Sequence, residues 1–187
     1  MAKVFDGIDS KLADFIGSQH VFFVGTAPAG DDGHVNVSPK GLDTFTILGP
    51  REVAYLDLTG SGIETVSHLR ENGRITIMFC AFEGPPKILR LQGRGEVIEE
   101  DDPRFPELRA LFGKRIGVRS VIRVELDRIA DSCGFGVPSM AYEGDRDTLA
   151  RWADNKGEEG VKAYREEMNV HSIDGLLGLP SVAPSTR

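Results

Sequence analysis

The chain has 187 residues, of which 22 are basic and 29 acidic, so its formal net charge is −7. This length fits one domain of ordinary size, and 40% hydrophobic with 27% charged residues is typical of a globular protein. The negative charge argues against nucleic acid as a partner, because it leaves no basic stripe to neutralise phosphates. The first residues lack the apolar stretch of a signal peptide, and the longest apolar run is far too short to cross a bilayer. We therefore expect a cytoplasmic protein with no membrane segment.

Hydrophobic spacing predicts the elements in chain order. Apolar residues at positions 8, 12, 15 and 16 indicate a short amphipathic helix. Beyond it, alternating or apolar runs between turn residues predict strands, and two further periodic stretches predict short helices. We expect strands over 21–26, 35–38, 44–48 and 52–58, a helix over 63–71, strands over 74–82 and 87–99, a helix over 106–112, and a strand over 121–129.

The connections between these strands decide the fold class. Most of them are too short for parallel crossover units, so residues 1–130 are predicted to form a small antiparallel barrel. In the strand predicted over 87–99, Gly93 and Gly95 indicate a bend or a close approach of another backbone.

From residue 131 the composition changes to a loop rich in glycine and proline, followed by a charged segment. Residues 131–187 are predicted to form a helical C-terminal extension that packs on the barrel or on a dimer partner. Within it, we expect a helix over 147–168 that is broken at Gly157 and Gly160, and an irregular stretch over 169–187.

Several familiar signatures of chemistry are missing. The chain has no GxGxxG, Walker A, GxSxG, HExxH or CxxC motif, and its two cysteines, Cys80 and Cys133, make no disulfide framework. The four histidines are scattered, and Glu64 with His68, at i and i+4, is interpreted as a solvated pair on a helix face. The sequence therefore assigns no metal site and no catalytic side chain.

The most informative stretch is Asp57–Thr65 (DLTGSGIET), where a strand ends, a loop with two glycines follows and a helix begins. Glycines allow close backbone approach, and a helix N-terminus presents unpaired N–H groups with a partial positive charge. The hydroxyls of Thr59, Ser61 and Thr65 add donors, so the stretch suits a phosphate. An ordinary turn with a hydroxyl cap is the alternative, and Glu64 fits it by compensating the helix dipole.

A second group of polar residues lies in the stretch from 35 to 41 (VNVSPKG). Lys40 stands where a strand gives way to a turn, and Asn36 and Ser38 alternate on one face. A lysine at this position can reach an anion that lies over the barrel, and Arg90 is a candidate second cation. An arginine inside an apolar strand is costly unless paired, so Arg90 is expected to meet either a carboxylate or a ligand phosphate.

In their order and spacing, these motifs resemble the pyridoxamine 5′-phosphate oxidase-like family of FMN-binding split barrels. The likeness covers about residues 8–129 and is carried by SPKG (38–41), TGSGIET (59–65), ENGRITIMF (71–79) and ILRLQGRGEV (88–97). It implies a mainly β (α+β) fold, a six-stranded antiparallel split barrel with peripheral helices, which forms a homodimer with FMN sites at the interface. The cofactor-binding residues carried over from the family are Asn36, Ser38, Lys40, Thr59, Gly60, Ser61, Gly62, Thr65 and Arg90.

The chain departs from the oxidases proper at two places. They carry a serine-arginine-lysine run where this chain has Ser61, Gly62 and Ile63, and their C-terminal arginines for the substrate have no match here. The resemblance therefore implies an FMN-dependent oxidoreductase for an unidentified small molecule, and not the oxidase of pyridoxamine phosphate. The alternatives are a non-catalytic flavin- or haem-binding module, with His34 or His68 as the haem ligand, and a reductase that uses the deazaflavin F420.

Overall fold

The computed structural model describes residues 3–179. The end of the predicted irregular stretch, 180–187, lies outside the described residues. The elements are β1 (Val4–Phe5), α1 (Ser10–Gly17), β2 (Phe22–Thr26), β3 (Asn36–Lys40), β4 (Phe45–Gly49), β5 (Glu52–Leu58), α2 (Glu64–Asn72), β6 (Arg74–Cys80), β7 (Ile88–Ile98), α3 (Phe105–Ala110), β8 (Val118–Ser132) and α4 (Thr148–Met168).

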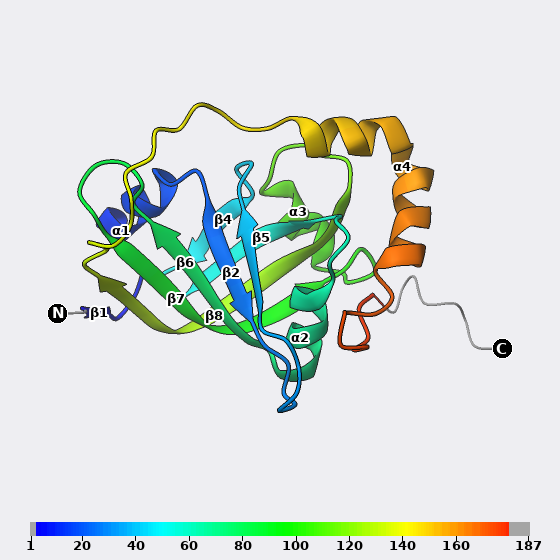
Figure 1. Ribbon diagram of the computed structural model, residues 1–187, viewed down its shortest axis with the longest axis horizontal. Helices are drawn as coiled ribbons and strands as arrows, with labels where there is room; N and C mark the ends of the chain where they lie inside the picture. The colour runs from blue at the N-terminus through cyan, green and yellow to red at the C-terminus, as the bar shows by residue number, and fades with distance from the viewer. Residues whose placement is uncertain (1–2, 180–187) are drawn as a thin grey trace.

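The strands form one antiparallel sheet in the order β3-β2-β6-β7-β8-β5-β4, and β1 pairs with β8 (Figure 1). The edge strands β3 and β4 lie at the two ends of this order, so the sheet of the described residues does not close. An open, strongly curved antiparallel sheet of this kind is a split barrel, which confirms the predicted fold class.

The predicted strands are all present, and the strand over 52–58 matches β5 residue for residue. The sheet contains eight strands rather than the six that the resemblance implied. The sequence patterns missed β1, because a strand of two residues shows no alternation. The break at Gly157 is confirmed by its left-handed φ of 66°, whereas Gly160 stays helical, so the second predicted break is wrong.

The predicted close approach at Gly93 is confirmed. The pairing of β7 with β8 shifts register between Gln92 and Gly93. A Cβ atom at Gly93 would lie only 1.9 Å from the carbonyl oxygen of Glu125, so no other residue fits there without movement of the backbone. The bulge bends β7 and helps to curve the sheet into the barrel.

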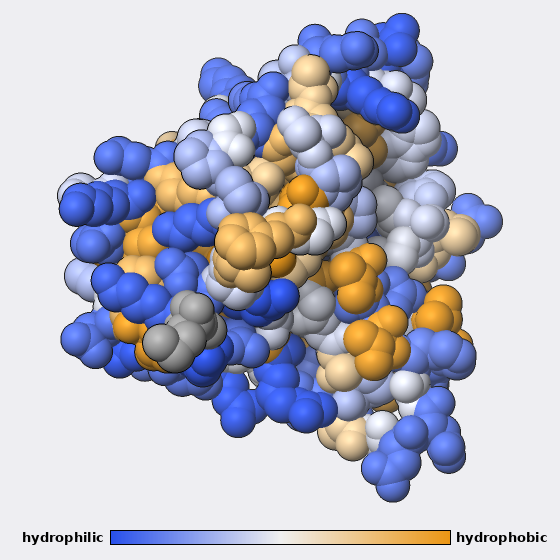
Figure 2. Space-filling model, turned by 60° about the vertical axis from the view of Figure 1, so that its left-hand side comes forward, coloured by the Kyte–Doolittle hydropathy of each residue, from blue (hydrophilic) through white to orange (hydrophobic). Residues whose placement is uncertain are grey.

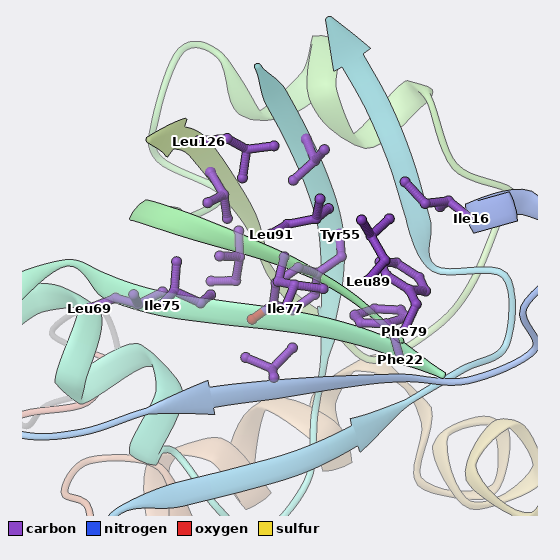
Figure 3. Close-up of a cluster of buried hydrophobic side chains, with 14 of the residues drawn as sticks. Ile16, Phe22, Tyr55, Leu69, Ile75, Ile77, Phe79, Leu89, Leu91 and Leu126 are labelled. Carbon is purple, nitrogen blue, oxygen red and sulfur yellow. The ribbon is translucent and has the colours of Figure 1, made fainter. Parts of the chain in front are cut away.

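The main core fills the inside of the barrel, where the inward side chains of the sheet meet α1 and α2 (Figure 3). Aromatic rings hold its centre, with the centroids of Phe22 and Phe79 5.7 Å apart. A smaller cluster on the other face of β5 and β8 packs against α3. Because both of its faces are covered, β5 is buried along most of its length, and so is Asp57 near its end.

The C-terminal extension runs along the outside of the barrel. After β8, the chain crosses the molecule without regular structure and then forms α4 on the far side, beside α3 and the start of α2 (Figure 1). The crossing segment is tied to the loop between β6 and β7, because Met140 N donates to Phe82 O at 3.0 Å.

No helix within residues 3–179 is long and apolar enough to cross a membrane. Both cysteines are free, Cys80 buried and Cys133 exposed.

Candidate anion-binding site

Three of the predicted site residues meet where the inner face of β3 approaches α2. Asn36 Nδ2 donates to Thr65 Oγ1 at 3.0 Å and lies 3.2 Å from Ser38 Oγ. Alternation along β3 places Asn36, Ser38 and Lys40 on the same face of the sheet. The edge strand therefore presents a line of polar groups to the first turn of α2.

Lys40 ends this line and lies beside a buried ion pair. Its Nζ is 3.7 Å from Asp57 Oδ1. Arg119 donates two hydrogen bonds to the same carboxylate, from Nε to Oδ2 at 2.6 Å and from Nη2 to Oδ1 at 3.1 Å. Ser120 Oγ donates a third bond to Asp57 Oδ2 at 3.3 Å. Burial by itself would raise the pKa of Asp57, but Arg119 and Lys40 outweigh it and hold that pKa below its usual value. Two cations on one carboxylate leave one positive charge in surplus at this end of β3.

The loop between β5 and α2 is held from behind by two long-range side chains. Arg119 Nη1 donates to Gly62 O at 2.9 Å, while Asn169 Nδ2 donates to Gly60 O at 2.9 Å and lies 3.5 Å from Ser61 O. In a planar trans peptide, the N–H of the next residue points opposite to the C=O. The N–H groups of residues 61–63 therefore point away from Arg119 and Asn169, and none of them has an acceptor among residues 3–179.

The first turn of α2 adds to this group of donors. Its N-cap residue, Ile63, makes no side-chain hydrogen bond to the helix, so the alternative of an ordinary hydroxyl-capped turn is wrong. The one acidic residue of the first turn, Glu64, lies over the loop: a Cβ atom at Gly62 would be 2.5 Å from Glu64 Oε2. The loop thus presents unpaired N–H groups and a helix N-terminus, the features that bind anions in proteins.

Thr59 has a different role from the one that the resemblance implied. Its hydroxyl donates to Gly117 O at 2.9 Å and accepts a bond from Arg165 Nε at 2.8 Å. The side chain is buried, and both of its hydrogen-bonding capacities are used by the protein. Thr59 thus fastens the loop to β8 and α4, and Ser61 is the exposed hydroxyl of the loop.

Arg90 does not join the other eight predicted residues within one chain. Lys40, Phe22, Phe79 and Leu89 are directly opposite one another across the sheet and so share a face. Arg90 follows Leu89 and points to the opposite face. Its Nη1 lies 3.1 Å from Ser132 Oγ, and among the described residues it pairs with no carboxylate.

The interpretation of His68 as half of a solvated pair is wrong. His68 is fully buried, with Nδ1 3.0 Å from Thr26 Oγ1, and its Nε2 has no partner among the described residues. The ring meets Thr26 of β2, and the C-terminal segment covers the neighbouring position of α2, where Ser67 Oγ donates to Leu176 O at 3.4 Å. Burial lowers the pKa of His68, although the nearby carboxylates of Asp174, Glu64 and Glu71 act in the opposite direction.

His34 is exposed and bound to the C-terminal segment. Its Nδ1 is 2.6 Å from Asp174 Oδ1, and its backbone N–H donates to Asp174 Oδ2 at 2.8 Å. These bonds lower the pKa of Asp174. The two histidines proposed as haem ligands are thus a buried ring and a ring hydrogen-bonded to Asp174. Within residues 3–179 no three His, Cys, Asp or Glu side chains gather as a metal site.

Sequence patterns could not identify Arg119 and Asn169, the two residues that hold the loop. They lie 57 and 109 residues from their loop partners Gly62 and Gly60. Alternation along β8 gives no signal for Arg119, because it places this residue on the face of Arg123 and Glu125, whereas the first five residues of β8 are all buried. A buried arginine of this kind calls for a carboxylate partner, and Asp57 is that partner.

The fold and this site define an open antiparallel barrel with an anion-binding loop at a helix start. A family model described as pyridoxamine 5′-phosphate oxidase matches residues 8–133. The chain therefore belongs to the pyridoxamine 5′-phosphate oxidase family.

The similarity to individual proteins agrees with this assignment. The chain is 40% identical over 200 residues to the pyridoxamine 5′-phosphate oxidase family protein ustO of Aspergillus flavus. This alignment covers 97% of this chain and 79% of ustO. The crystal structure of HupZ from Group A Streptococcus matches with a TM-score of 0.53 and 20% identity, over 72% of this chain and 99% of HupZ. A structure from Lactobacillus delbrueckii matches with a TM-score of 0.52 and 18% identity, over 68% of this chain and 98% of the other. At these identities, the two structures support the fold alone.

Proposed function

We propose that this protein binds FMN by its phosphate at the start of α2 and acts as a flavin-dependent oxidoreductase on a small molecule. The observation that carries the proposal is the loop before α2: the carbonyl groups of residues 60–62 accept bonds from Arg119 and Asn169, and the N–H groups of residues 61–63 point away without acceptors in the described part of the chain. Membership of the family supports flavin as the source of the phosphate.

The residues present fit a phosphate group. The outward N–H groups, the exposed hydroxyl of Ser61 and the Ser38 and Thr65 hydroxyls supply donors, and Lys40 supplies charge. Since Gly62 and Ile63 replace the basic pair of the oxidases proper, the phosphate depends on backbone N–H groups more than on side chains. A bound flavin supplies the redox-active ring, while the protein orients it and sets the polarity around it.

A homodimer belongs to this proposal, with a second copy of the chain on the outer face of β2 and β3. Surface apolar side chains lie in separate patches among charged ones (Figure 2). On β3 and just before it, Val37 is 65% exposed and Val35 72%. The same face carries Arg90 and a cavity of about 430 Å³ over β2, β6 and β7. In such a dimer, Arg90 is available to a cofactor site at the interface.

The first test is the visible absorption spectrum of the purified protein before and after addition of FMN. We expect flavin bands near ~370 and ~450 nm, and FMN that co-elutes with the protein. A Soret band near ~400 nm would instead indicate haem. A colourless protein that does not retain FMN would contradict the proposal, and the same titration with F420 would then follow.

Two variants locate the phosphate. Lys40→Gln and Thr65→Val each remove a group of the site, and a hydrogen bond to a charged group contributes about 1.5–3 kcal/mol, so FMN affinity should fall about tenfold or more. Lys11→Gln, an exposed lysine on α1, is the matched control. Equal affinities in all three variants would place the phosphate elsewhere.

Turnover separates the enzyme from a flavin-binding module. Stopped-flow mixing of the FMN-loaded protein with NADH or NADPH should bleach the flavin band if the protein is an oxidoreductase that accepts these donors. A protein that binds FMN tightly and stays oxidised with either donor would favour the non-catalytic module.

A further inference from the structure

A cavity of about 450 Å³ lies between the turn after β3, the segment before β8 and the start of α4. Its apolar wall includes Leu42, Leu58 and Leu149, which come from the turn, from β5 and from α4. The volume falls in the range of small-molecule sites, which are mostly apolar with a few polar groups that fix orientation. One wall belongs to the C-terminal extension, so the cavity exists only where the extension packs on the barrel.

The charged residues of this cavity are unbalanced. Arg109, Lys114 and Arg115 contribute three positive charges, and Asp154 contributes one negative charge. Among the described residues, none of the three cations forms an ion pair with a carboxylate. Arg109 donates to the backbone oxygens of Phe112 at 3.2 Å and of Gly113 at 3.0 Å, which holds its guanidinium in place without neutralising it. The cavity therefore has a net charge of +2.

Arg115 supplies an independent sign of a missing partner. Its Nε is buried and has no hydrogen-bond acceptor among residues 3–179, although another nitrogen of the same group donates to Leu42 O. A buried N–H without an acceptor is unfavourable, so the guanidinium gains a bond when it turns toward a ligand oxygen.

Backbone strain is concentrated at the same place. Leu42 and Asp43 have left-handed φ angles of 61° and 53°, a backbone conformation that residues other than glycine rarely adopt. The contact of Arg115 with Leu42 O and the bond from Thr44 Oγ1 to Gly41 O at 2.7 Å hold this turn. Strain of this kind clusters at ligand sites, where the surrounding structure imposes it.

We propose that this cavity binds a small organic anion, with its acidic group at Arg115 and Lys114 and its apolar body against Leu42, Leu58 and Leu149. The proposal is independent of FMN, because none of these residues belongs to the phosphate site. Lys40 and Leu42 are two residues apart, and Leu58 directly precedes Thr59, so the anion would lie close to the phosphate site.

Calorimetric titration with 1-naphthoate, 1-naphthylmethanol and inorganic phosphate tests the combination of charge and apolar surface. We expect 1-naphthoate to bind at least about tenfold more tightly than either of the other two, because only it satisfies both the unpaired cations and the apolar wall. Its affinity should fall as the salt concentration rises. Equal binding of naphthoate and naphthylmethanol would overturn the proposal.

Two variants on exposed positions test the location while the fold is preserved. Lys114→Glu should weaken naphthoate at least about tenfold and leave naphthylmethanol unchanged, since it alters charge alone. Ala150→Trp fills the cavity from α4 and should weaken both compounds. Lys11→Glu, on the exposed face of α1, is the matched charge reversal and should change neither.

Amide chemical shifts recorded during the titration give the site directly. Changes centred on residues 114–117 and 149–150 would support the proposal, and changes confined to the Ser61–Thr65 loop would overturn it. Titration with naphthoate in the absence of FMN keeps the result separate from the proposed flavin function: an FMN-free protein that binds naphthoate supports this site whether or not flavin binds.

Discussion

The barrel and the C-terminal extension are held in different ways. The barrel buries one large apolar core, whereas α4 and the segment after it, up to residue 179, contribute only three buried hydrophobic residues, Ala153, Val161 and Leu179. The extension is attached instead by hydrogen bonds from Arg165 and Asn169 to the loop before α2 and its neighbours. The barrel thus depends mainly on apolar packing, whereas the extension depends on a few polar bonds that also hold the loop of the candidate site.

The largest effect is expected from Arg119, where the two regions meet. Arg119→Met leaves the buried Asp57 with Lys40 and the hydroxyl of Ser120, and removal of one partner of a buried ion pair costs about 3–5 kcal/mol. Urea unfolding followed by circular dichroism measures this loss in the free energy of unfolding. Arg123→Met, which breaks a half-exposed pair with Glu52, is the control and should cost about 1 kcal/mol or less.

A double variant sharpens this test. Asp57→Asn together with Arg119→Met removes the uncompensated charge, so it should recover part of the lost stability. A double variant that is less stable than Arg119→Met alone would show that the charge balance is not what holds this site.

The next largest effect is expected at Asn169, which lies in the C-terminal extension. Asn169→Ala removes the side-chain partner of two loop carbonyls and one of the bonds of Arg119, which should cost about 2 kcal/mol and weaken FMN binding more than it weakens the barrel. Thermal unfolding and a flavin fluorescence titration measure the two effects. Asn155→Ala, at an exposed position of α4, is the matched control. Unchanged FMN affinity in Asn169→Ala would separate the extension from the site.

His68 makes the stability dependent on pH. Its pKa is lowered in the folded protein, so the unfolded chain binds more protons than the folded one below the ordinary pKa of about 6.5. The free energy of unfolding should therefore fall as the pH decreases from 7.5 to 5.5. In His68→Gln, this decrease should be smaller, and equal slopes in the two proteins would contradict the prediction.

The smallest effect is expected at Glu64, whose carboxylate lies over the loop. Glu64→Gln removes a negative charge from the helix N-terminus, where a charge contributes about 0.3–1 kcal/mol. FMN affinity should rise by about two- to fivefold at low salt, measured by flavin fluorescence. Weaker binding in Glu64→Gln would mean that this carboxylate helps to hold the ligand.

The sequence was sufficient for the elements and for the location of the loop. β5 was predicted to the residue because apolar residues fill it and turn residues bound it. The grouping of Asn36, Ser38 and Lys40 on one face follows from alternation alone. Both results depend only on local periodicity, which sequence patterns describe well.

The missing parts depend on contacts between distant segments. Spacing at i and i+4 is the same whether a helix face is solvated or covered, so the spacing of Glu64 and His68 could not reveal that His68 packs against Thr26 of β2. The face on which Arg90 lies could not be predicted for a related reason: alternation gives two faces but does not say which of them carries Lys40. Only the register from Lys40 to Leu89 settles that question.

Pro39 has a consequence for the behaviour of the protein at high concentration. It lies in the edge strand β3, opposite Phe23, and proline has no N–H to donate. In an edge strand, the missing donor faces the free side, where a further strand would have to pair. The backbone of β3 is therefore a poor template for fibrillar growth, although Val37 exposes an apolar side chain on this strand. Replacement of Pro39 by valine should make the protein more prone to aggregate on heating.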